Sequence, residues 1–499
     1  MGERVRIELQ PSGTAFEVER GTPLKEVLFA YGVEFPCGGR GRCRRCRVKV
    51  LAGQAPPTAA EQRLLSSEEL AHGWRLACHA AADADLRLEV AQWGAPVLAD
   101  ESAFEFVPGE GLGMAVDLGT TTLVAQLLDL ATGRVLGVRT GLNPQAGYGA
   151  DIMSRIEFAL SAAGQSKLER LIRAGVGRLV QDLLPAAPAA IRKVVVVGNT
   201  VMHHFFCGLD VEPLSHVPFE TPENGLKTFR AAELGWDVPG DPVVEFLPCL
   251  GSFVGSDILA GLLATRMPES GDLIGLIDLG TNGEIVFGNR HRIVCASTAA
   301  GPAFEGGRVS MGMQAATGAI SEVSVEEGQL RCRVLGGVQP RGICGSGLVD
   351  AVAAGLELGL ITTTGRLSHG PLAVCPPVVL TQADVRELQL AKAATAAGIR
   401  IVLDRLGAAP GDVHRLYLAG AFGNYINRAS ARRIGLIDFP EEKVEPAGNT
   451  ALLGAKLALF GKPFGHLPGR VEHISLAADP RFQETYVEEM SFPAAAPLT

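Results

Sequence analysis

The N-terminal part of the chain alternates polar and apolar positions in short stretches, a pattern typical of a small, half-buried sheet. Arg4 to Leu9 predicts one strand, residues 11–13 a turn, and Ala15 to Val18 a returning strand. The pair Thr22-Pro23 is typical of a capped helix start. The alternating stretch Arg47 to Leu51 predicts a further strand. Together these elements indicate a small β-grasp domain.

Two stretches farther along the chain repeat one pattern: an apolar strand, Asp-Leu-Gly-Thr, a tight turn and a second apolar strand. Residues 113–123 read GMAVDLGTTTL, and residues 275–286 read GLIDLGTNGEIV. Each copy continues into a third strand, over Gly133 to Thr140 and over Arg290 to Ser297. A repeat at about one domain's spacing indicates a duplicated unit. We therefore predict two related α/β lobes, each opening with an antiparallel meander.

The stretch between the N-terminal domain and the first lobe is acidic and contains Gly and Pro, which indicates a linker. We expect a ferredoxin-sized domain over residues 1–95, a linker over 96–111, a first lobe over 112–270 and a second lobe over 271–499. The C-terminal segment of the second lobe can return to the first lobe in this arrangement.

Composition and charge narrow the function classes. The chain has 499 residues, of which 47% are hydrophobic, so it can bury large cores. Its net charge of -9 and its 6% of aromatic residues argue against nucleic-acid binding. The sequence lacks an apolar stretch of about 18 residues and an N-terminal signal pattern. We expect a cytoplasmic protein without a membrane or nucleic-acid partner.

Four cysteines lie close to the N-terminus with a ligand-like spacing. Cys37, Cys43 and Cys46 form C-x5-C-x2-C, and 31 residues separate Cys46 from Cys78. Three thiolates on one glycine-rich loop and one from a distant segment suit a [2Fe–2S] cluster. Structural zinc is the alternative, but zinc sites usually supply two close pairs. The other six cysteines lack ligand spacing and are expected to be buried small hydrophobes: Cys207, Cys249, Cys295, Cys332, Cys344 and Cys375.

The cysteine loop is strongly basic. Six cations lie within ten residues: Arg40, Arg42, Arg44, Arg45, Arg47 and Lys49. They can steer an acidic redox partner to the cluster edge. An equally good interpretation is that they offset the charge of the cluster and stay solvated.

The repeated Asp-Leu-Gly-Thr motif suits phosphate binding. Asp117 and Asp278 end their strands, where carboxylates can hold Mg²⁺ directly or through its waters. The backbone N–H groups and hydroxyls that follow can donate to phosphate oxygens. The candidate phosphate-binding residues are Gly119, Thr120, Thr121 and Thr122 in the first copy and Gly280, Thr281, Asn282 and Gly283 in the second. Two such loops facing one another would hold a triphosphate from both sides.

A third motif, RLYLAGAFGN at residues 415–424, is a strand followed by a glycine-rich turn. Gly420, Ala421, Phe422 and Gly423 would let an adenosine group approach the backbone. Two further features leave alternatives open. Glu284 is a candidate for orienting the attacking water, and a purely structural carboxylate is an equally good interpretation. His203 and His204 are expected to be helix residues at the interface of the lobes rather than residues facing a ligand.

These motifs resemble the ASKHA superfamily of acetate and sugar kinases, heat-shock chaperones and actin. The resemblance covers roughly residues 112–465. It implies a two-lobed, actin/hexokinase-like domain that binds ATP and Mg²⁺, with connecting helices near residues 195–209 and 342–356. The predicted fold is thus a multidomain α+β and α/β protein: an N-terminal β-grasp [2Fe–2S] ferredoxin domain followed by an ASKHA domain.

The combination resembles the reductive activators of corrinoid-dependent methyltransferases, which serve anaerobic methyl-transfer and O-demethylation pathways. Further stretches carry this resemblance: NPQAGYGADIMSRI at 143–156, GNTVMHH at 198–204, GPAFEGG at 301–307 and GICGSG at 342–347. It implies an ATP-hydrolysing iron–sulfur reductase that passes one electron uphill from the cluster to Co(II), giving Co(I). The implied partners are a corrinoid protein, an external low-potential electron donor and, in a homodimer, a second copy of the chain.

Two enzyme classes compete with this interpretation. One is the activator of 2-hydroxyacyl-CoA dehydratases, also an ASKHA ATPase, although that family lacks an N-terminal ferredoxin. The other is a small-molecule kinase under redox control. A non-enzymatic chaperone or sensor that uses ATP only as a switch is a further alternative.

Overall fold

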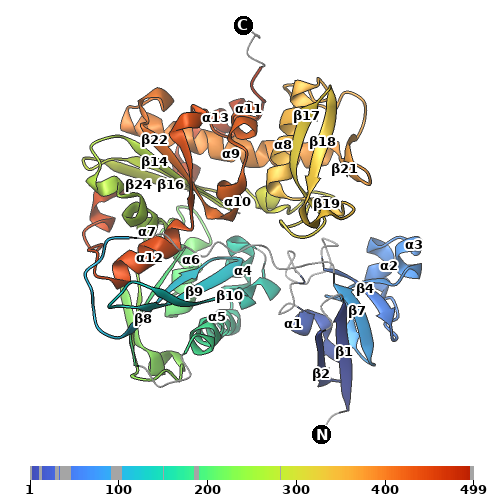
Figure 1. Cartoon of the computed structure of the whole chain (residues 1–499), viewed down its shortest axis with the longest axis horizontal. Helices are drawn as coiled ribbons and strands as arrows, with labels where there is room; N and C mark the ends of the chain where they lie inside the picture. Colours follow the sequence, from blue (N-terminus) through green and yellow to red (C-terminus); the bar gives the residue numbers. More distant parts are fainter. Residues whose placement is uncertain are drawn as a thin grey trace.

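The computed structural model describes residues 3–10, 14–28, 33, 46–90, 104–149, 151–184, 190–280 and 282–494. Cys37, Cys43 and Thr281, three of the predicted site residues, lie outside these ranges. A small N-terminal unit and two larger lobes can be followed by colour along the chain (Figure 1). Among the described residues, no helix combines the length and apolar character needed to cross a membrane.

The N-terminal unit is a mixed sheet with a single buried face. The strand order is β2-β1-β7-β4-β5, with bounds Thr14–Glu19, Arg4–Gln10, Leu86–Val90, Arg47–Ala52 and Trp74–Leu76. Strands β1 and β2 form the predicted hairpin, and β7 runs parallel to β1. Ile7, Val48 and Leu88 are fully buried in its core. Three short helices complete the unit: α1 (Leu24–Leu28), α2 (Ala59–Leu64) and α3 (Ser67–Ala71).

The prediction of a helix cap at Thr22 was wrong. Thr22–Pro23 forms a short strand, β3, which pairs with β6 (Ala81–Ala82), and helix α1 begins only at Leu24. The Thr22 hydroxyl donates to the carbonyl of Glu19 instead of capping a helix. A tertiary strand pairing therefore overrides the local capping signal.

The first lobe is built on a six-stranded sheet covered by helices. The strand order is β10-β9-β8-β11-β13-β12, with bounds Val135–Leu142, Thr122–Asp129, Leu112–Leu118, Ile191–Gly198, Val243–Phe246 and Lys227–Arg230. Strands β8, β9 and β10 form the predicted antiparallel meander, and β11 runs parallel to β8. The helices of this lobe are α4 (Ile152–Ala159), α5 (Ala162–Asp182), α6 (Thr200–Cys207) and α7 (Ser256–Thr265).

The second lobe repeats the meander and the two parallel strands beside it, whereas its sixth strand, β24, lies at the opposite edge, parallel to β16. Its strand order is β23-β22-β14-β15-β16-β24, with bounds Val444–Gly448, Arg415–Ala419, Ile274–Leu279, Gly283–Gly288, Ile293–Thr298 and Val471–His473. Strands β14, β15 and β16 form the second meander, and β22 runs parallel to β14. Its helices are α9 (Gln382–Leu406), α10 (Gly420–Tyr425), α11 (Arg428–Arg433), α12 (Thr450–Leu459) and α13 (Phe482–Glu488).

An insertion between β16 and α9 adds a smaller subdomain to the second lobe. It contains β17 (Ala319–Glu326), β18 (Gln329–Val334), β19 (Gly342–Ile343), α8 (Gly345–Glu357), β20 (Leu372–Cys375) and β21 (Val378–Leu380). Strand β18 alternates exposed polar residues with the half-buried Leu330, Cys332 and Val334.

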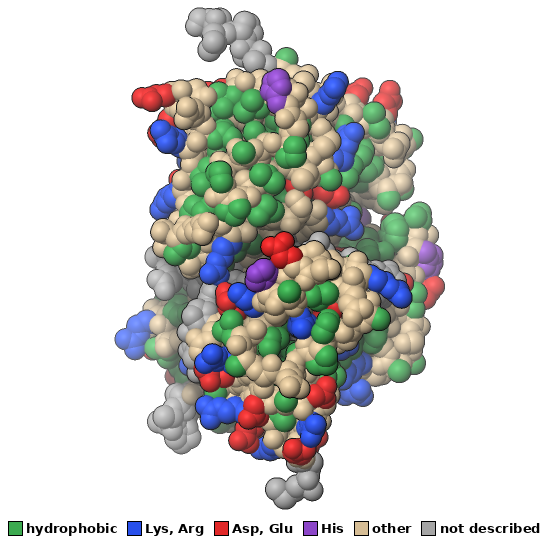
Figure 2. Space-filling view, turned by 90° about the vertical axis from the view of Figure 1, so that its right-hand side faces the viewer, with side chains coloured by type: hydrophobic (Ala, Val, Ile, Leu, Met, Phe, Trp, Pro, Cys, Tyr) green, Lys and Arg blue, Asp and Glu red, His purple; other side chains and the backbone are tan. Residues whose placement is uncertain are grey.

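On the face turned toward the viewer in Figure 2, hydrophobic side chains gather in the upper half, whereas charged side chains are spread over the lower half.

Helices α7 and α12 join the two lobes. Their backbones come so close at Gly454 that a Cβ on this residue would lie 2.1 Å from the carbonyl oxygen of Ala260. Only glycine therefore fits at this position. Helix α12 also packs on β8 and β11 of the first lobe, whereas the elements that follow it, β24 and α13, pack on β16 and α9 of the second lobe. Helices are present near the predicted residues 195–209 and 342–356, but the prediction that they connect the lobes was wrong. Helix α6 packs on α5 and β11 within the first lobe, and α8 packs on β17 within the second.

Residues 104–111 form a segment, here called the strap, that leads into β8. Its Phe104 and Phe106 pack against Phe460, with ring centroids 5.2 and 4.7 Å apart. The Gly109 amide donates to the carbonyl of Leu130, which locks the strap onto the turn after β9. The second half of the predicted linker is therefore packed on the nucleotide-binding part of the molecule.

Candidate nucleotide and cluster sites

The first phosphate loop is a tight turn between β8 and β9. The amide of Gly119 donates to the carbonyl of Thr122, with a distance of 3.1 Å. A Cβ at Gly119 would lie 2.6 Å from that same oxygen, so the turn requires glycine. Asp117 lies near the end of β8, just before this turn, and Thr120 and Thr121 lie partly exposed in the turn itself. The turn thus carries the carboxylate and the hydroxyls that the sequence singled out, and their binding of Mg²⁺ and phosphate stays a prediction.

The second phosphate loop repeats this arrangement between β14 and β15. The amide of Gly280 donates to the carbonyl of Asn282, at 3.1 Å. Asp278 pairs across the strands with Glu284, which places both carboxylates at the same end of the meander. Gly283 is buried beneath the loop. The charge of Asp117 contributes to the raised pKa of Asp278, so the two carboxylates lie near one another.

The predicted adenosine motif lies against the second loop. Gly420 has a φ of 78°, and a Cβ there would lie 2.4 Å from Oδ1 of Asp278. The next residues, including Ala421 and Gly423, lie in helix α10. Phe422 stacks on Phe304, with ring centroids 4.6 Å apart. The structure thus brings all three glycine-rich motifs to one site.

Three side chains that sequence analysis did not single out hold the first loop in place. The Arg155 guanidinium donates to the carbonyl of Thr120 at 2.7 Å, and the Asn143 amide donates to that of Gly119 at 2.9 Å. The Asn199 amide donates to the Thr120 hydroxyl at 2.9 Å. Arg155 and Asn143 are completely buried. These contacts with the loop, together with hydrogen bonds to Gln145 and to the Gly149 carbonyl, satisfy their buried polar groups.

Asn449 connects the second lobe to the first phosphate loop. Its side-chain amide donates to Oδ2 of Asp117 at 2.8 Å, and its oxygen caps helix α12 by accepting from the Leu452 amide. The sequence showed Asn449 only as an ordinary cap before an apolar helix, so this long-range contact could not have been found there.

Buried carboxylates give the site a strongly perturbed electrostatic environment. Burial raises the pKa of Asp117 to about 6, and the hydrogen bond from Asn449 opposes this shift. Burial, with the nearby charges of Asp117 and Glu305, raises the pKa of Asp278 to about 7. Burial and the charge of Asp278 raise the pKa of Asp257 to about 8. Burial, with the charges of Asp257 and Asp278, raises the pKa of Glu284 well above its usual range.

A divalent cation fits this set of carboxylates because it would relieve their mutual repulsion. Asp257 and Glu305 are further members that sequence analysis missed. Among the described residues, no three His, Cys, Asp or Glu side chains lie close enough together to hold a metal ion by themselves. Mg²⁺ usually keeps several waters and binds substrate phosphates as well as carboxylates.

The described part of the predicted cluster site contains two of its four cysteines. Cys46 Sγ lies 3.3 Å from Cys78 Sγ, and the Ala77 amide donates to the carbonyl of Cys46. Cys46 precedes β4 and Cys78 follows β5, two paired strands. This juxtaposition of sulfurs from two segments fits the thiolate donor set of a [2Fe–2S] cluster. Cys37 and Cys43, the other two predicted ligands, lie outside the described residues.

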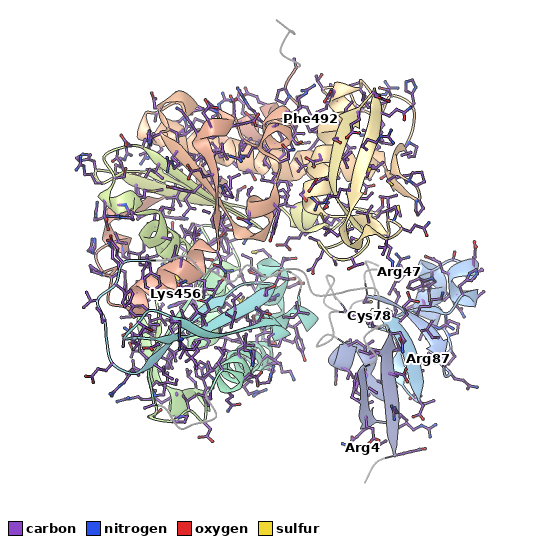
Figure 3. The ribbon with its side chains drawn as sticks, viewed as in Figure 1. Arg4, Arg47, Cys78, Arg87, Lys456 and Phe492 are labelled. Atoms are coloured by element: carbon purple, nitrogen blue, oxygen red, sulfur yellow. The ribbon has the colours of Figure 1, made fainter. Side chains whose placement is uncertain are left out.

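Part of the basic loop can be followed beside this pair. Arg47 forms an ion pair with Glu69 at 3.1 Å and lies over the ring of Trp74. Figure 3 labels Arg47 and Cys78 at the upper end of the N-terminal unit. The partial exposure of Arg47 leaves its charge available near the cysteines.

The two histidines of α6 are packed inside the first lobe. The His204 ring contacts the Thr200 carbonyl and the Thr221 hydroxyl, and the His203 ring contacts the Gly225 carbonyl. Burial lowers the pKa of His203 to about 3. The prediction that they are helix residues is confirmed, but they lie in the interior of the first lobe rather than at the interface.

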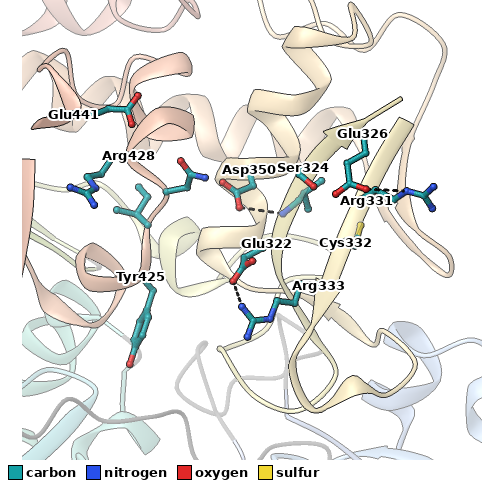
Figure 4. A pocket seen from close by; sticks show the side chains of 13 residues that line it. Glu322, Ser324, Glu326, Arg331, Cys332, Arg333, Asp350, Tyr425, Arg428 and Glu441 are labelled. Atoms are coloured by element: carbon teal, nitrogen blue, oxygen red, sulfur yellow. Dashed lines mark hydrogen bonds and ion pairs between the residues drawn. The ribbon is translucent and has the colours of Figure 1, made fainter. Parts of the chain in front are cut away.

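A separate hollow of about 650 Å³ lies between the insertion and helices α10 and α11 (Figure 4). Its charged side chains largely pair with one another, as in the ion pairs Arg333–Glu322 and Arg331–Glu326. Tyr425, at the end of α10, stands at its rim with its ring pointing away from these pairs (Figure 4). None of the predicted site residues lines this hollow.

The fold and site define a class: a [2Fe–2S] ferredoxin domain joined to a two-lobed ASKHA nucleotide-binding domain. Comparison with known families agrees with this class over nearly the whole chain. Residues 7–83 match the 2Fe-2S iron-sulfur cluster binding domain, 112–270 the RACo middle region, and 272–498 the C-terminal domain of RACo, the ASKHA domain.

Relatives of known activity give the family. The corrinoid activation enzyme RamQ of Eubacterium limosum is 35% identical over 419 residues, which cover 76% of this chain and 70% of that protein. The [Co(II) methylated amine-specific corrinoid protein] reductase of Methanosarcina barkeri is 27% identical over 420 residues, covering 76% and 77%. A solved structure of a reductive activator for corrinoid, iron-sulfur protein covers 98% of both chains with 26% identity and a TM-score of 0.68. The chain belongs to the family of reductive activators of corrinoid proteins.

Membership in this family shows which cofactor belongs to each domain. The protein carries a [2Fe–2S] cluster in its ferredoxin domain and binds ATP with Mg²⁺ in its ASKHA domain. The relatives named above are a corrinoid activation enzyme and a corrinoid protein reductase. Membership in their family therefore argues against the interpretations as a dehydratase activator or a small-molecule kinase.

Proposed function

We propose that this protein is an ATP-dependent reductase that converts the Co(II) form of a corrinoid protein to Co(I) by one-electron transfer. The observation that carries the proposal is the joining of two phosphate loops and a pair of adjacent cysteine sulfurs in one chain of the activator family. ATP hydrolysis makes an unfavourable transfer proceed by changing the affinity between the reductase and the corrinoid protein.

At the cluster end, Cys37, Cys43, Cys46 and Cys78 are the proposed ligands. The [2Fe–2S] cluster supplies the single electron, in a potential range near about -400 mV for ferredoxins of the plant type. The chain's own contribution is to bring Cys46 and Cys78 together from two paired strands and to place Arg47 beside them.

At the nucleotide end, Asp117 and Asp278 are proposed to organise Mg²⁺ and its waters. Thr120 to Thr122 and Thr281 to Gly283 donate to phosphate oxygens, and Gly420 to Gly423 receive the adenosine group. Glu284 is proposed to orient the attacking water. Burial and the charges of Asp257 and Asp278 raise its pKa well above its usual range, which favours a role in proton transfer over that of an ordinary surface carboxylate.

The wider assignments belong to the same proposal. We assign residues 1–95 to the ferredoxin domain, 96–111 to a linker, 112–270 to lobe I and 271–499 to lobe II. An external low-potential donor re-reduces the cluster after each transfer. We also propose that the protein acts in the cytoplasm and that it assembles as a homodimer.

Anaerobic spectroscopy tests the function directly. The cluster-loaded chain is mixed with a chemical reductant, Mg-ATP and a Co(II) corrinoid protein, and the visible spectrum is followed for formation of Co(I). We expect Co(I) to form only when ATP is hydrolysable. Absence of Co(I) with several corrinoid proteins, under conditions in which the cluster is reduced, would refute the proposal.

A further inference from the structure

Helix α12 contacts two distant places that the proposed function needs in the same cycle. Its first residue follows Asn449, which binds the phosphate-loop carboxylate of Asp117. Its last turn contacts the strap, the segment through which the chain from the ferredoxin domain enters the first lobe. One helix therefore links the nucleotide site to the attachment of the electron-donating domain.

At the first end, the Asn449 side chain is fixed on both sides. Its oxygen accepts from the Leu452 amide at 2.8 Å, and its nitrogen donates to Oδ2 of Asp117 at 2.8 Å. Mg²⁺ or one of its waters at this carboxylate oxygen would compete with the Asn449 amide for it. Nucleotide binding therefore acts on the first turn of α12.

At the other end, three aromatic rings hold the strap on the helix. The centroid of Phe460 lies 5.2 Å from that of Phe104 and 4.7 Å from that of Phe106, and the two strap rings are 5.4 Å apart. The ammonium of the buried Lys456 lies 5.3 Å from the Phe104 ring. Phe106 also covers Gly133, where a Cβ would lie 2.5 Å from its ring.

The helix between these ends is short and rigid. Ten residues at 1.5 Å each give a length of about 15 Å. The glycine contact of Gly454 with Ala260 holds its middle against α7 without an intervening side chain. Such a helix moves as one body, so a displacement at Asn449 is passed to Phe460.

We infer that α12 couples nucleotide binding to the strap: when Mg-ATP occupies the site, the contact between Asn449 and Asp117 is lost, α12 shifts, and the strap loosens from Phe460. The ferredoxin domain, whose last strand β7 ends at Val90, then gains freedom to move toward the corrinoid protein while nucleotide is bound. Phe106 and Phe460 are positioning residues in this scheme. The inference rests on the proposed nucleotide site and adds how that site governs the electron-donating domain.

Hydrogen exchange of the cluster-loaded full chain tests the direction of the coupling. We expect amides of residues 104–111 to exchange about fivefold faster or more when Mg²⁺ and a non-hydrolysable ATP analogue are added. In Asn449→Ala the link is cut, so the analogue should no longer change exchange in the strap. Unchanged exchange in the unsubstituted protein at saturating analogue would overturn the inference.

Reciprocal linkage gives a second, independent readout. If nucleotide loosens the strap, then weakening the strap must tighten nucleotide binding, by at most the factor by which nucleotide shifts the strap equilibrium. We expect Phe106→Ala to bind the Mg-analogue about fivefold tighter or more in calorimetry, and Phe106→Tyr to restore the original affinity. Val107→Ala is the matched control, because Val107 is the next residue of the strap and is 78% exposed. A purely structural role for Phe106 would lower stability without tightening binding.

The outcomes separate this inference from the proposed function. If the analogue does not bind the unsubstituted protein at all, the nucleotide site itself is wrong. If it binds but Phe106→Ala and Val107→Ala have equal affinities, only the coupling through α12 is wrong. Phe460→Leu, which keeps an apolar side chain at the other side of the contact, serves if Phe106→Ala fails to fold and should also tighten binding.

Discussion

Replacing Asp278 by Asn should stabilise the protein increasingly as the pH rises, provided that Mg²⁺ and nucleotide are left out. Burial, together with the charges of Asp117 and Glu305, raises the pKa of the Asp278 carboxyl from 3.8 to about 7. The folded chain therefore holds this proton more tightly than the unfolded chain. Stability is present in full at low pH and is lost as the proton dissociates between about pH 4 and pH 7. Asn, which has no proton to lose, avoids this loss.

The size of the effect follows from the same pKa values. The difference between 3.8 and about 7 corresponds to about 4 kcal/mol at most. Because the Asp278 carboxylate is partly open to solvent, screening reduces this to roughly 2 kcal/mol. The free-energy advantage of Asp278→Asn should thus be near zero at about pH 4 and reach about 2 kcal/mol above pH 7.

Urea unfolding in the presence of a chelator, followed by far-ultraviolet circular dichroism across this pH range, measures the difference. Asp272→Asn is the matched control, since Asp272 lies just before the same strand but is exposed. Adding Mg²⁺ and ADP should abolish the advantage, because the cation then balances the ionised carboxylate. An advantage that does not change with pH, or that shrinks as the pH rises, would refute the electrostatic account of the site.

Three further substitutions test the separate parts of the molecule. Asp117→Ala should abolish ATP-driven formation of Co(I) while leaving the visible spectrum of the cluster intact; loss of the cluster would contradict the separation of the two sites. Cys78→Ser should remove the visible spectrum of the cluster yet leave the nucleotide affinity, measured by calorimetry, within about twofold of that of the unsubstituted protein. A large drop in affinity would contradict the independence of the two sites. Gly420→Ala should weaken nucleotide binding by about tenfold or more, because a left-handed backbone disfavours Ala by about 1–2 kcal/mol and its methyl group meets Asp278. Unchanged affinity in Gly420→Ala would place adenosine elsewhere.

Local pattern was sufficient to predict the frame of the molecule. The two meanders, the tight turns at Gly119 and Gly280 and the parallel strand before Gly420 follow from alternation and glycine placement within short windows. The N-terminal hairpin followed in the same way. The sequence also predicted that the two Asp-Leu-Gly-Thr loops face one another, because the same pattern occurs in both, and the resemblance to the ASKHA superfamily added the adenosine motif at Gly420 to Gly423.

What could not be predicted depends on contacts between distant segments. Asn449 looks like an ordinary helix cap, and only the folded chain shows its bond to Asp117. Asp257 of the first lobe interacts with Asp278 only because the two lobes come together, and Glu305 approaches Asp278 through the fold of the second lobe. Thr22 carries a genuine capping signal that a pairing with Ala82 overrides. Roles in the chemistry, such as that of Glu284, remain predictions for the experiments above.

The contact of Gly454 with Ala260 has a mechanical consequence for how the lobes can move. The backbones of α7 and α12 touch at one point, with no side chain between them. Such a contact can serve as a pivot about which the two helices rotate relative to one another. Sliding along one another would instead drive the neighbouring residues of α7 and α12, such as Leu259 and Leu452, out of their buried positions. This contact favours rotation over sliding in any relative motion of α7 and α12, and a single methyl group at Gly454 would be enough to push the two helices apart.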